Sequence, residues 1–139
     1  MLSNLRQRIA KDESGFTLIE LLVVLIIIGV LLAIAVPSYL GFKERAEKRA
    51  SASNVRAAIP AAEAYYGDQS PNSYAAISVG ALQTTVDQGI KLNTAVAKNV
   101  GAGTNNGYCL SSKVGSWWGY VMGPGGTVQN SNAAADPCA

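Results

Sequence analysis

The residue of this sequence best placed to do chemistry is Glu20, a carboxylate near the beginning of a long apolar run. From Leu21 to Val36 no side chain carries a charge, and nearly all are Leu, Ile, Val or Ala. As a helix, residues 16–36 would be about 32 Å long, which matches the ~30 Å hydrocarbon layer of a bilayer. An unpaired carboxylate there costs on the order of several kcal/mol. We therefore expect Glu20 to need a cationic partner, and none lies nearby on the same helix face; the alternative is that Glu20 reaches the membrane interface.

The two cysteines, Cys109 and Cys138, are a second pair with defined chemistry. Both lie far from the apolar run. In an exported protein an even number of cysteines predicts a disulfide formed in an oxidising compartment, and the alternative is two buried free thiols. A bridge would hold the small, polar tail at 129–139 against a strand. The chain-entropy estimate of its stabilisation is about 3–4 kcal/mol.

Catalytic and metal sites find little support in this composition. The 139 residues include no histidine, which excludes histidine-based catalysis and histidine metal ligands. The acids that follow the predicted helix, Asp68, Asp87 and Asp136, have no spacing typical of a site. Asp136 alone is a poor basis for a calcium site, which needs six or more oxygens. We predict no enzyme, no metal and no cofactor, and a membrane-tethered enzyme is the weakest alternative.

The apolar run has basic residues ahead of it, which orient the chain in a membrane. Arg6, Arg8 and Lys11 precede it, so residues 1–15 should stay on the cytoplasmic side and the remainder should face out. The run is too long for the core of an ordinary secretory signal, and no small-residue cleavage site follows it. If the chain is cut, Gly15 is the better position. The net charge of +2 gives no argument for nucleic acid binding by the chain alone.

The helix should continue past the apolar run as an amphipathic segment. Val55, Ile59, Ala62 and Tyr66 recur at helical spacing, and Gly67 should end the helix. A charged stretch at 43–49 precedes this stripe and is most simply a solvated face, in which Glu44 and Lys48 have the favourable i,i+4 spacing.

Three positions should weaken the helix. Pro37 and Pro60 lack the N–H that an interior helical hydrogen bond needs, and Gly29 is a weak helix former. We expect the turns from Gly29 to Pro37 to bend or unwind, although a plain kink is the alternative. A second bend is expected at Pro60.

The remainder, residues 68–139, should form a small head. A loop with a helical turn at 81–86 comes first, and strand patterns follow at 92–100, 108–114, 117–122 and 127–129. Consecutive strands with short turns predict an antiparallel meander with one face on the helix and the other in water. Trp117 and Trp118 should point to opposite faces, so one of them marks a subunit contact or is covered by a loop.

The run Gly15-Phe16-Thr17-Leu18-Ile19-Glu20 resembles the prepilin signature, or class III signal, of type IV pilins and pseudopilins. The resemblance implies an α+β fold with a long N-terminal helix packed on an antiparallel meander. It divides the chain into a cleaved leader (1–15), a transmembrane and filament-core helix (16–37), an amphipathic half-helix (38–67) and a head with a disulfide-closed tail (68–139).

The resemblance also assigns roles to single residues. A prepilin peptidase would cut between Gly15 and Phe16 and methylate Phe16. Glu20 matches the acidic residue of the family, and Gly29 and Pro37 fall where such pilins often have Gly and Pro. The cut creates an amine on Phe16, which in a filament of staggered parallel helices meets Glu20 of a neighbouring subunit. A charge pair in a low dielectric is strong once formed.

The expected function is a structural subunit of an extracellular type IV pilus, assembled as a homo-oligomer. The subunit would be a single-pass precursor in the inner, or cytoplasmic, membrane before assembly. Its partners would be the prepilin peptidase, an assembly platform and an extraction ATPase. Adhesion, motility and DNA uptake are roles of such filaments in general, and nucleic acid would be bound only through the filament. The alternative is a pseudopilin of a type II secretion or competence system.

Overall fold

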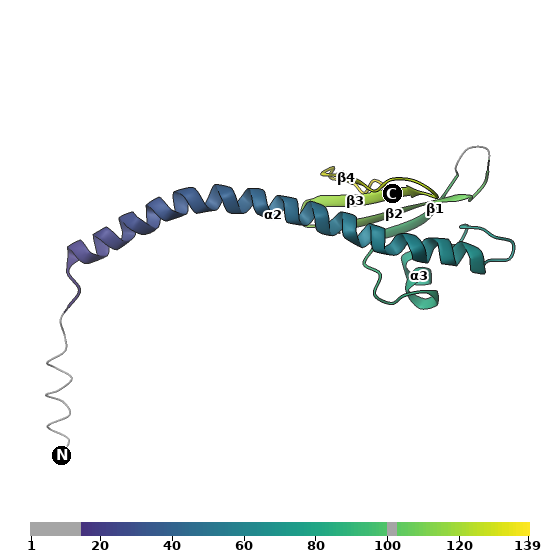
Figure 1. Ribbon diagram of the computed structural model, residues 1–139, viewed down its shortest axis with the longest axis horizontal. Helices are drawn as coiled ribbons and strands as arrows, with labels where there is room; N and C mark the ends of the chain where they lie inside the picture. The colour runs from purple at the N-terminus through teal and green to yellow at the C-terminus, as the bar shows by residue number, and fades with distance from the viewer. Residues whose placement is uncertain (1–14, 100–102) are drawn as a thin grey trace, which may run out of the picture. The chain divides into compact units, whose positions relative to one another are not determined.

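The computed structural model describes residues 15–99 and 103–139 of the chain. The predicted leader, apart from Gly15, and residues 100–102 lie outside the described residues. Within the described residues, two helices are followed by four strands (Figure 1), which confirms the predicted α+β class. Their bounds are α2 Leu18–Asp68, α3 Val79–Thr85, β1 Thr94–Lys98, β2 Gly107–Val114, β3 Trp117–Gly123 and β4 Gln129–Ser131. The chain divides into two compact units between Leu40 and Gly41.

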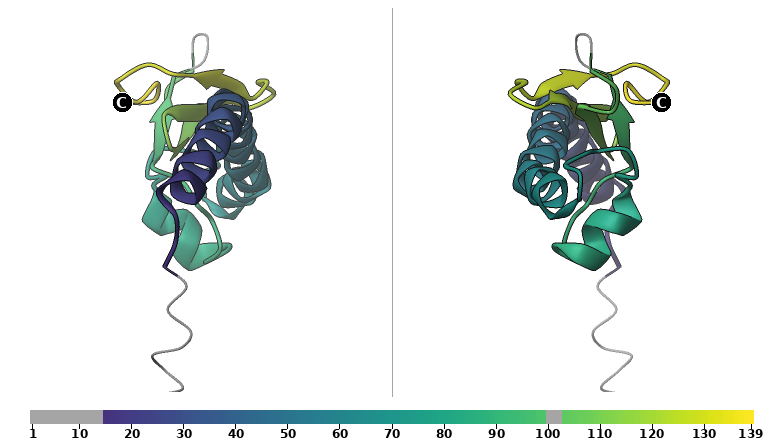
Figure 2. Two further views of the ribbon diagram at one scale, coloured as in Figure 1. Left: turned by 90° about the vertical axis from the view of Figure 1, so that its left-hand side faces the viewer. Right: turned by 90° about the vertical axis from the view of Figure 1, so that its right-hand side faces the viewer.

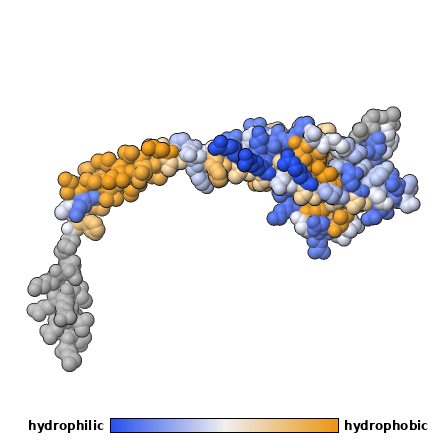
Figure 3. Space-filling view, in the orientation of Figure 1, coloured by the Kyte–Doolittle hydropathy of each residue, from blue (hydrophilic) through white to orange (hydrophobic). Residues whose placement is uncertain are grey.

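The first unit contains the apolar part of α2. The helix begins at Leu18, two residues later than the sequence predicted, and is continuous through Gly29 and Pro37. Every residue from 15 to 40 is exposed, and Figure 3 shows hydrophobic side chains over this segment with a hydrophilic spot near its beginning. By length and composition, α2 is the one helix among residues 15–99 and 103–139 that could cross a bilayer.

The second unit, residues 41–139, is built on the later part of α2. Small residues dominate the face that α2 buries, namely Ser51, Ala52, Val55, Ala58, Ala61, Ala62 and Tyr65. The predicted stripe is therefore rotated slightly, because Ile59 and Tyr66 are only partly buried. The helix continues through Pro60 and ends at Asp68, one residue beyond the predicted stop at Gly67.

The four strands form one antiparallel sheet in the order β1-β2-β3-β4, which confirms the predicted meander. Leu110 pairs with Val121 and Ala95 with Leu110, and all three belong to the core cluster that includes Val55 and Ala58 of α2. Figure 2 shows the sheet along one side of α2 and α3 lying below both. The core thus lies between the later part of α2, the sheet and α3.

Gly119 of β3 lies close to the backbone of α2. A Cβ on Gly119 would lie 2.5 Å from the carbonyl carbon and oxygen of Ser51. Only glycine leaves room for the helix backbone at this distance. Together with the small residues on the buried face of α2, Gly119 lets the helix and the sheet pack closely.

Two predicted elements lie at shifted positions. The helical turn expected at 81–86 is α3, Val79–Thr85, whose N-cap Ser78 accepts a hydrogen bond from the Ala81 N–H at 3.1 Å. The last strand was predicted at 127–129, which is wrong by two residues, since β4 is Gln129–Ser131. The Gly-Pro-Gly-Gly turn runs further into the chain than its composition indicated.

The face of the sheet turned away from α2 is partly covered, whereas the sequence predicted that it faces water. The indole N–H of Trp118 donates to the carbonyl of Ala133 at 3.1 Å, and Trp118 is only 7% exposed. Trp117 is partly buried, with the Nζ of Lys48 4.8 Å from its ring centre. Of the two alternatives for an outward Trp, the covering loop is the one observed.

Candidate processing and assembly site

Gly15, Phe16 and Thr17 precede the first turn of α2 in non-helical backbone. Phe16 is 83% exposed, and a Cβ on Gly15 would have nothing within 4 Å. The peptide bond predicted as the cut site therefore lies outside the helix and is unobstructed by the described residues.

Thr17 and Glu20 form a capping box at the beginning of α2. The carboxylate Oε2 of Glu20 accepts the Thr17 N–H at 2.8 Å and the Thr17 hydroxyl at 2.6 Å, and the Glu20 N–H donates back to that hydroxyl oxygen at 3.3 Å. This reciprocal pairing satisfies amides that the first turn of a helix leaves without partners. Within the described residues, Oε1 of Glu20 accepts no hydrogen bond and stays available.

The sequence interpretation missed this local role of Glu20. It sought only a cationic partner for the carboxylate. The signal was present, because Thr-x-x-Glu directly before an apolar run is the pattern of a capping box.

The apolar surface after the capping box includes a shallow groove. Its walls are the exposed side chains of Leu18, Leu21, Leu22, Leu25 and Ile26. Contiguous apolar surface of this extent is unusual on a protein that stays in water. The segment can therefore insert into lipid or pack against other apolar helices.

The other predicted site residues of α2 lie within its regular part. A Cβ on Gly29 would meet nothing within 4 Å, and Pro37 is exposed. Their role in bending or unwinding remains a prediction. In the described ranges, no group of three or more His, Cys, Asp or Glu residues could hold a metal ion.

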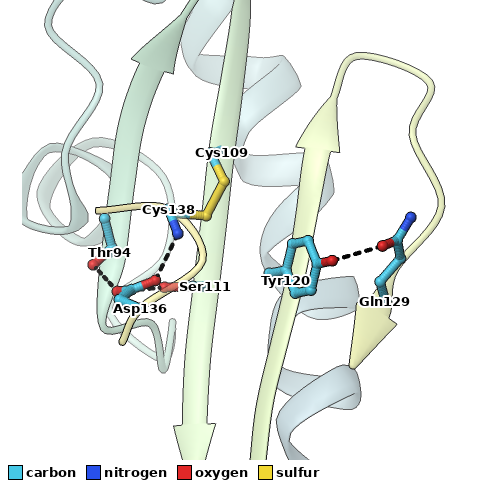
Figure 4. Close-up of a disulfide and its surroundings, with 7 residues drawn as sticks. All are labelled: Thr94, Cys109, Ser111, Tyr120, Gln129, Asp136 and Cys138. Carbon is cyan, nitrogen blue, oxygen red and sulfur yellow. Dashed lines mark hydrogen bonds between the residues drawn. A yellow bond between two sulfur atoms is a disulfide. The ribbon is translucent and has the colours of Figure 1, made fainter. Parts of the chain in front are cut away.

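A disulfide joins Cys109 of β2 to Cys138 of the tail, on the outer face of the sheet (Figure 4). Both half-cystines are buried. Beside the bridge, the Asp136 carboxylate accepts hydrogen bonds from the Thr94 hydroxyl at 2.5 Å, the Ser111 hydroxyl at 2.9 Å and the Cys138 N–H at 2.8 Å. Asp136 thus fastens the tail to two strands, a role that the sequence interpretation missed.

The environment of Asp136 acts on its pKa in two directions. Desolvation raises the pKa, but the hydrogen bonds from Thr94, the Cys138 N–H and Ser111, aided by the charge of Lys98, outweigh it. The pKa of Asp136 is therefore lowered, and the carboxylate stays charged against the sheet.

Two further carboxylates join α2 to distant parts of the second unit. Glu63 accepts the phenol O–H of Tyr74 and that of Tyr108, both at 2.8 Å. Glu47 accepts the N–H and the hydroxyl of Ser116, both at 3.2 Å, in the turn between β2 and β3. These contacts hold the helix on the loop and the sheet.

The charged stretch at 43–49 is thus only partly the solvated face that the sequence predicted. The ion pair in it is Lys43–Glu47 at 3.7 Å, and the predicted Glu44–Lys48 pair does not form in the described structure. Lys48 instead lies over the ring of Trp117, and Glu47 is turned toward the sheet.

Comparison with known proteins finds the prokaryotic N-terminal methylation motif at residues 10–36. The type IV major pilin protein PilA of Myxococcus xanthus is 36% identical over 66 residues, which are 48% of this chain and 30% of that protein. The type II secretion system core protein G of Escherichia coli is 41% identical over 58 residues, 42% of this chain and 40% of that protein. A fimbrial protein of Pseudomonas aeruginosa is 47% identical over 53 residues, 38% of this chain and 34% of that protein.

These matches confirm the resemblance to type IV pilins and pseudopilins. Each spans less than half the length of the relative it matches. The names describe a pilin, a secretion system core protein and a fimbrial protein, and none of these names describes an enzyme. No solved structure matches the chain significantly.

Proposed function

We propose that this chain is a pilin, the structural subunit of an extracellular type IV pilus filament. The observation that carries the proposal is the exposed apolar surface of α2 up to Leu40, headed by the single carboxylate of Glu20 within a methylation motif. Such a surface is stable only against lipid or against other apolar side chains. A membrane-anchored precursor and then a filament of packed helices cover it in turn.

Processing prepares the subunit for assembly. The prepilin peptidase cuts between Gly15 and Phe16 and methylates the new amine of Phe16. In the filament, this amine pairs with Glu20 of a neighbouring subunit. The capping box supports this pairing, because Oε2 is held by Thr17 and Oε1 accepts nothing among the described residues. A buried carboxylate is tolerated when hydrogen bonds and a counter-charge satisfy both of its oxygens.

The region from Gly29 to Pro37 is where α2 adapts between the two environments. Pro37 leaves the carbonyl of Ala33 without its usual helical donor, and Gly29 stabilises a helix less than alanine would. We propose that these turns bend or unwind when the helix leaves the lipid and enters the filament.

The cellular partners follow from this pathway. The precursor crosses the inner, or cytoplasmic, membrane once, with residues 1–15 on the cytoplasmic side. An assembly platform and an extraction ATPase supply the work of removing the apolar helix from lipid. The finished filament, a helical homo-oligomer, lies outside the cell.

A pseudopilin of a type II secretion or competence system is the second candidate. Several relatives, among them proteins of Escherichia coli and Vibrio cholerae, are named type II secretion system core protein G. The disulfide-closed tail favours the pilin. Filament length under native expression separates the two, because the pilin predicts long surface fibres and the pseudopilin predicts short ones.

The assembly proposal is tested with Glu20→Gln and with Glu44→Gln, an exposed carboxylate farther along α2, as the matched control. Sheared surface fractions of cells expressing each chain are quantified, and the sheared protein is sequenced from its N-terminus. We expect methylated Phe16 as the first residue and at least a tenfold loss of filaments for Glu20→Gln alone, with unchanged membrane levels. Wild-type filament yield from Glu20→Gln would refute the pairing, and another first residue would refute the cut site.

A further inference from the structure

A second groove lies on α2 in the unit formed by residues 41–139. Its lining residues are Phe42, Arg45, Ala46 and Arg49, all of them exposed. At about 100° per residue, they lie on the side of the helix turned away from Ser51 and Val55, which are buried. Strongly hydrophilic side chains gather along this part of α2 in Figure 3. The groove therefore combines an aromatic side chain with two guanidinium groups on a free helix face.

The two guanidinium groups have no carboxylate partner within the described part of the chain. The ion pair found there is Lys43–Glu47, and Glu47 is turned toward Ser116. Glu44 neighbours Arg45 in sequence but lies about 100° around the helix. Lys48 and Lys113, by contrast, lie over the rings of Trp117 and Trp118. Arg45 and Arg49 are thus free to bind an external anion.

The position of the groove in the sequence indicates which anion. The exposed apolar side chains continue past residue 36 through Tyr39 and Leu40 to Phe42, and a basic residue, Lys43, follows. A bilayer span of about 20 residues that ends near Phe42 places Arg45 and Arg49 about 5 and 11 Å beyond it along the axis. Aromatic side chains are enriched at both membrane–water interfaces, and an arginine near the end of a span can place its guanidinium among the headgroups while its stem lies along apolar surface. Helical side chains lean toward the N-terminus of the helix, so both guanidinium groups lean toward the side from which the apolar run comes.

We propose that Arg45 and Arg49 bind the phosphate of an anionic lipid headgroup in the outer leaflet of the membrane. Phe42 contacts the apolar part of the same lipid. This inference rests on the membrane-anchored precursor of the proposed function. The two arginines are one turn apart, about 6 Å along the axis, so both can donate to one phosphate group. Bound lipid would hold the precursor at a fixed depth until extraction.

The test uses the full unprocessed chain in nanodiscs of phosphatidylcholine with increasing fractions of phosphatidylglycerol. Native mass spectrometry measures the lipids retained by the protein. For Arg45→Gln and Arg49→Gln, we expect the half-saturating fraction of phosphatidylglycerol to rise roughly fivefold each, since one basic residue near an anionic surface contributes a factor of that size. Arg56→Gln, an exposed arginine about two turns beyond the groove, is the charge-matched control and should change the fraction less than twofold.

Several outcomes would overturn the lipid assignment. These are equal retention of the two lipids by the wild type, unchanged retention in the double variant, and displacement of the lipid by millimolar inorganic phosphate. A loss of filaments without any change in lipid retention would assign the groove to a second copy of the chain instead. Filament yield is scored separately, so wild-type filaments without lipid preference refute this inference and leave the pilin proposal standing.

Discussion

At the scale of single residues, carboxylates connect segments of the second unit that are far apart in sequence. Glu63 binds two phenol groups, one of them 45 residues away, and Glu47 binds Ser116 across 69 residues. Tyr74 is in ring contact with both Tyr66 and Tyr108, with centroids 4.6 and 5.0 Å apart. The Glu63 carboxylate satisfies the hydroxyl groups of two buried rings, which would otherwise be costly to bury.

The phenols of Tyr74 and Tyr108 should make stability depend on alkaline pH. Desolvation, with the hydrogen bond and the charge of Glu63, raises the pKa of both side chains above the usual value near 10. The two phenols contribute fully to the free energy of unfolding below pH 10. This contribution is lost as the pH rises from 10 toward the raised folded-state pKa of each phenol. We expect the free energy of unfolding of the full chain in detergent to fall above pH 10, by up to about 1.4 kcal/mol per pH unit for each phenol.

Urea titrations followed by circular dichroism at pH 8 to 11 measure this slope. The double variant Tyr74→Phe/Tyr108→Phe should lose most of it, because phenylalanine has no proton to release. An equally steep fall in the double variant would show that other groups cause the alkaline loss.

Some of these residue contacts could be predicted from the sequence and others could not. The capping box of Thr17 and Glu20 is local, so its spacing alone identifies it. Glu63 binds Tyr108, and Asp136 binds Thr94. Only the folded chain brings these partners close together. No short pattern encodes such pairs, which is why Asp136 was considered only as a poor metal ligand.

At the scale of elements, the close packing of α2 on β3 depends on small residues on both sides. Ser51 and Ala52 of α2 face Gly119 of β3, and the backbones approach closely there. Sequence patterns predict that a helix and a sheet will pack, because each has an apolar face. They do not predict the distance between them, which depends on where the glycine of one element meets the small residues of the other.

The variant Gly119→Ala should separate the helix from the sheet. Its Cβ would clash with backbone atoms of Ser51 and Ala52, which cannot move as a flexible side chain can. We expect a loss of about 3 kcal/mol in the free energy of unfolding, measured by urea titration. Gly67→Ala is the control, since its Cβ would meet nothing within 4 Å. This variant should be as stable as the wild type or up to about 1 kcal/mol more stable, because alanine favours a helix more than glycine does. Equal stability of Gly119→Ala and the wild type would contradict the packing described here.

The tail is held on the sheet by the disulfide and by Asp136. Because folding lowers the pKa of Asp136, the ionised carboxylate stabilises the folded chain above about pH 4, where an unperturbed aspartate is ionised. This stabilisation is lost as the pH falls through the folded-state pKa of Asp136. Asp136→Asn should cost roughly 1–3 kcal/mol at pH 7, because it leaves hydroxyl donors of Thr94 and Ser111 without a charged acceptor. It should also remove part of the loss of stability in acid.

Thermal unfolding between pH 2 and 7 measures both effects of Asp136→Asn. The matched control is Asp87→Asn, an exposed acid that accepts only the Gly89 N–H in the described structure. A wild-type acid profile for Asp136→Asn would show that the tail does not depend on this carboxylate.

At the scale of the whole molecule, the apolar run and the packed core belong to different units. Every buried hydrophobic residue among the described residues lies between Ala52 and Cys138, and no residue from 15 to 40 is buried. The sequence predicted boundaries after residues 37 and 67, because charge-free apolar stretches and alternating strand patterns are each visible within a short window. The boundary itself, between Leu40 and Gly41, has no marker in composition, since α2 runs through it.

A chain that starts at Gly41 should therefore fold and stay in solution without detergent. We expect its thermal midpoint to lie within about 5 °C of that of the full chain in mild detergent, because no core contact is removed; such a shift corresponds to about 1 kcal/mol. Circular dichroism and size-exclusion chromatography measure this. Aggregation or a missing unfolding transition would show that the apolar part of α2 supports the fold.

The two adjacent tryptophans give this protein two separate optical reporters. The indole of Trp118 donates to Ala133 of the tail, whereas the ring of Trp117 lies under Lys48 of α2. Trp117→Phe would leave an emission signal that follows detachment of the tail, and Trp118→Phe one that follows separation of the helix from the sheet. Stopped-flow fluorescence of the two variants could thus time each event without an added dye.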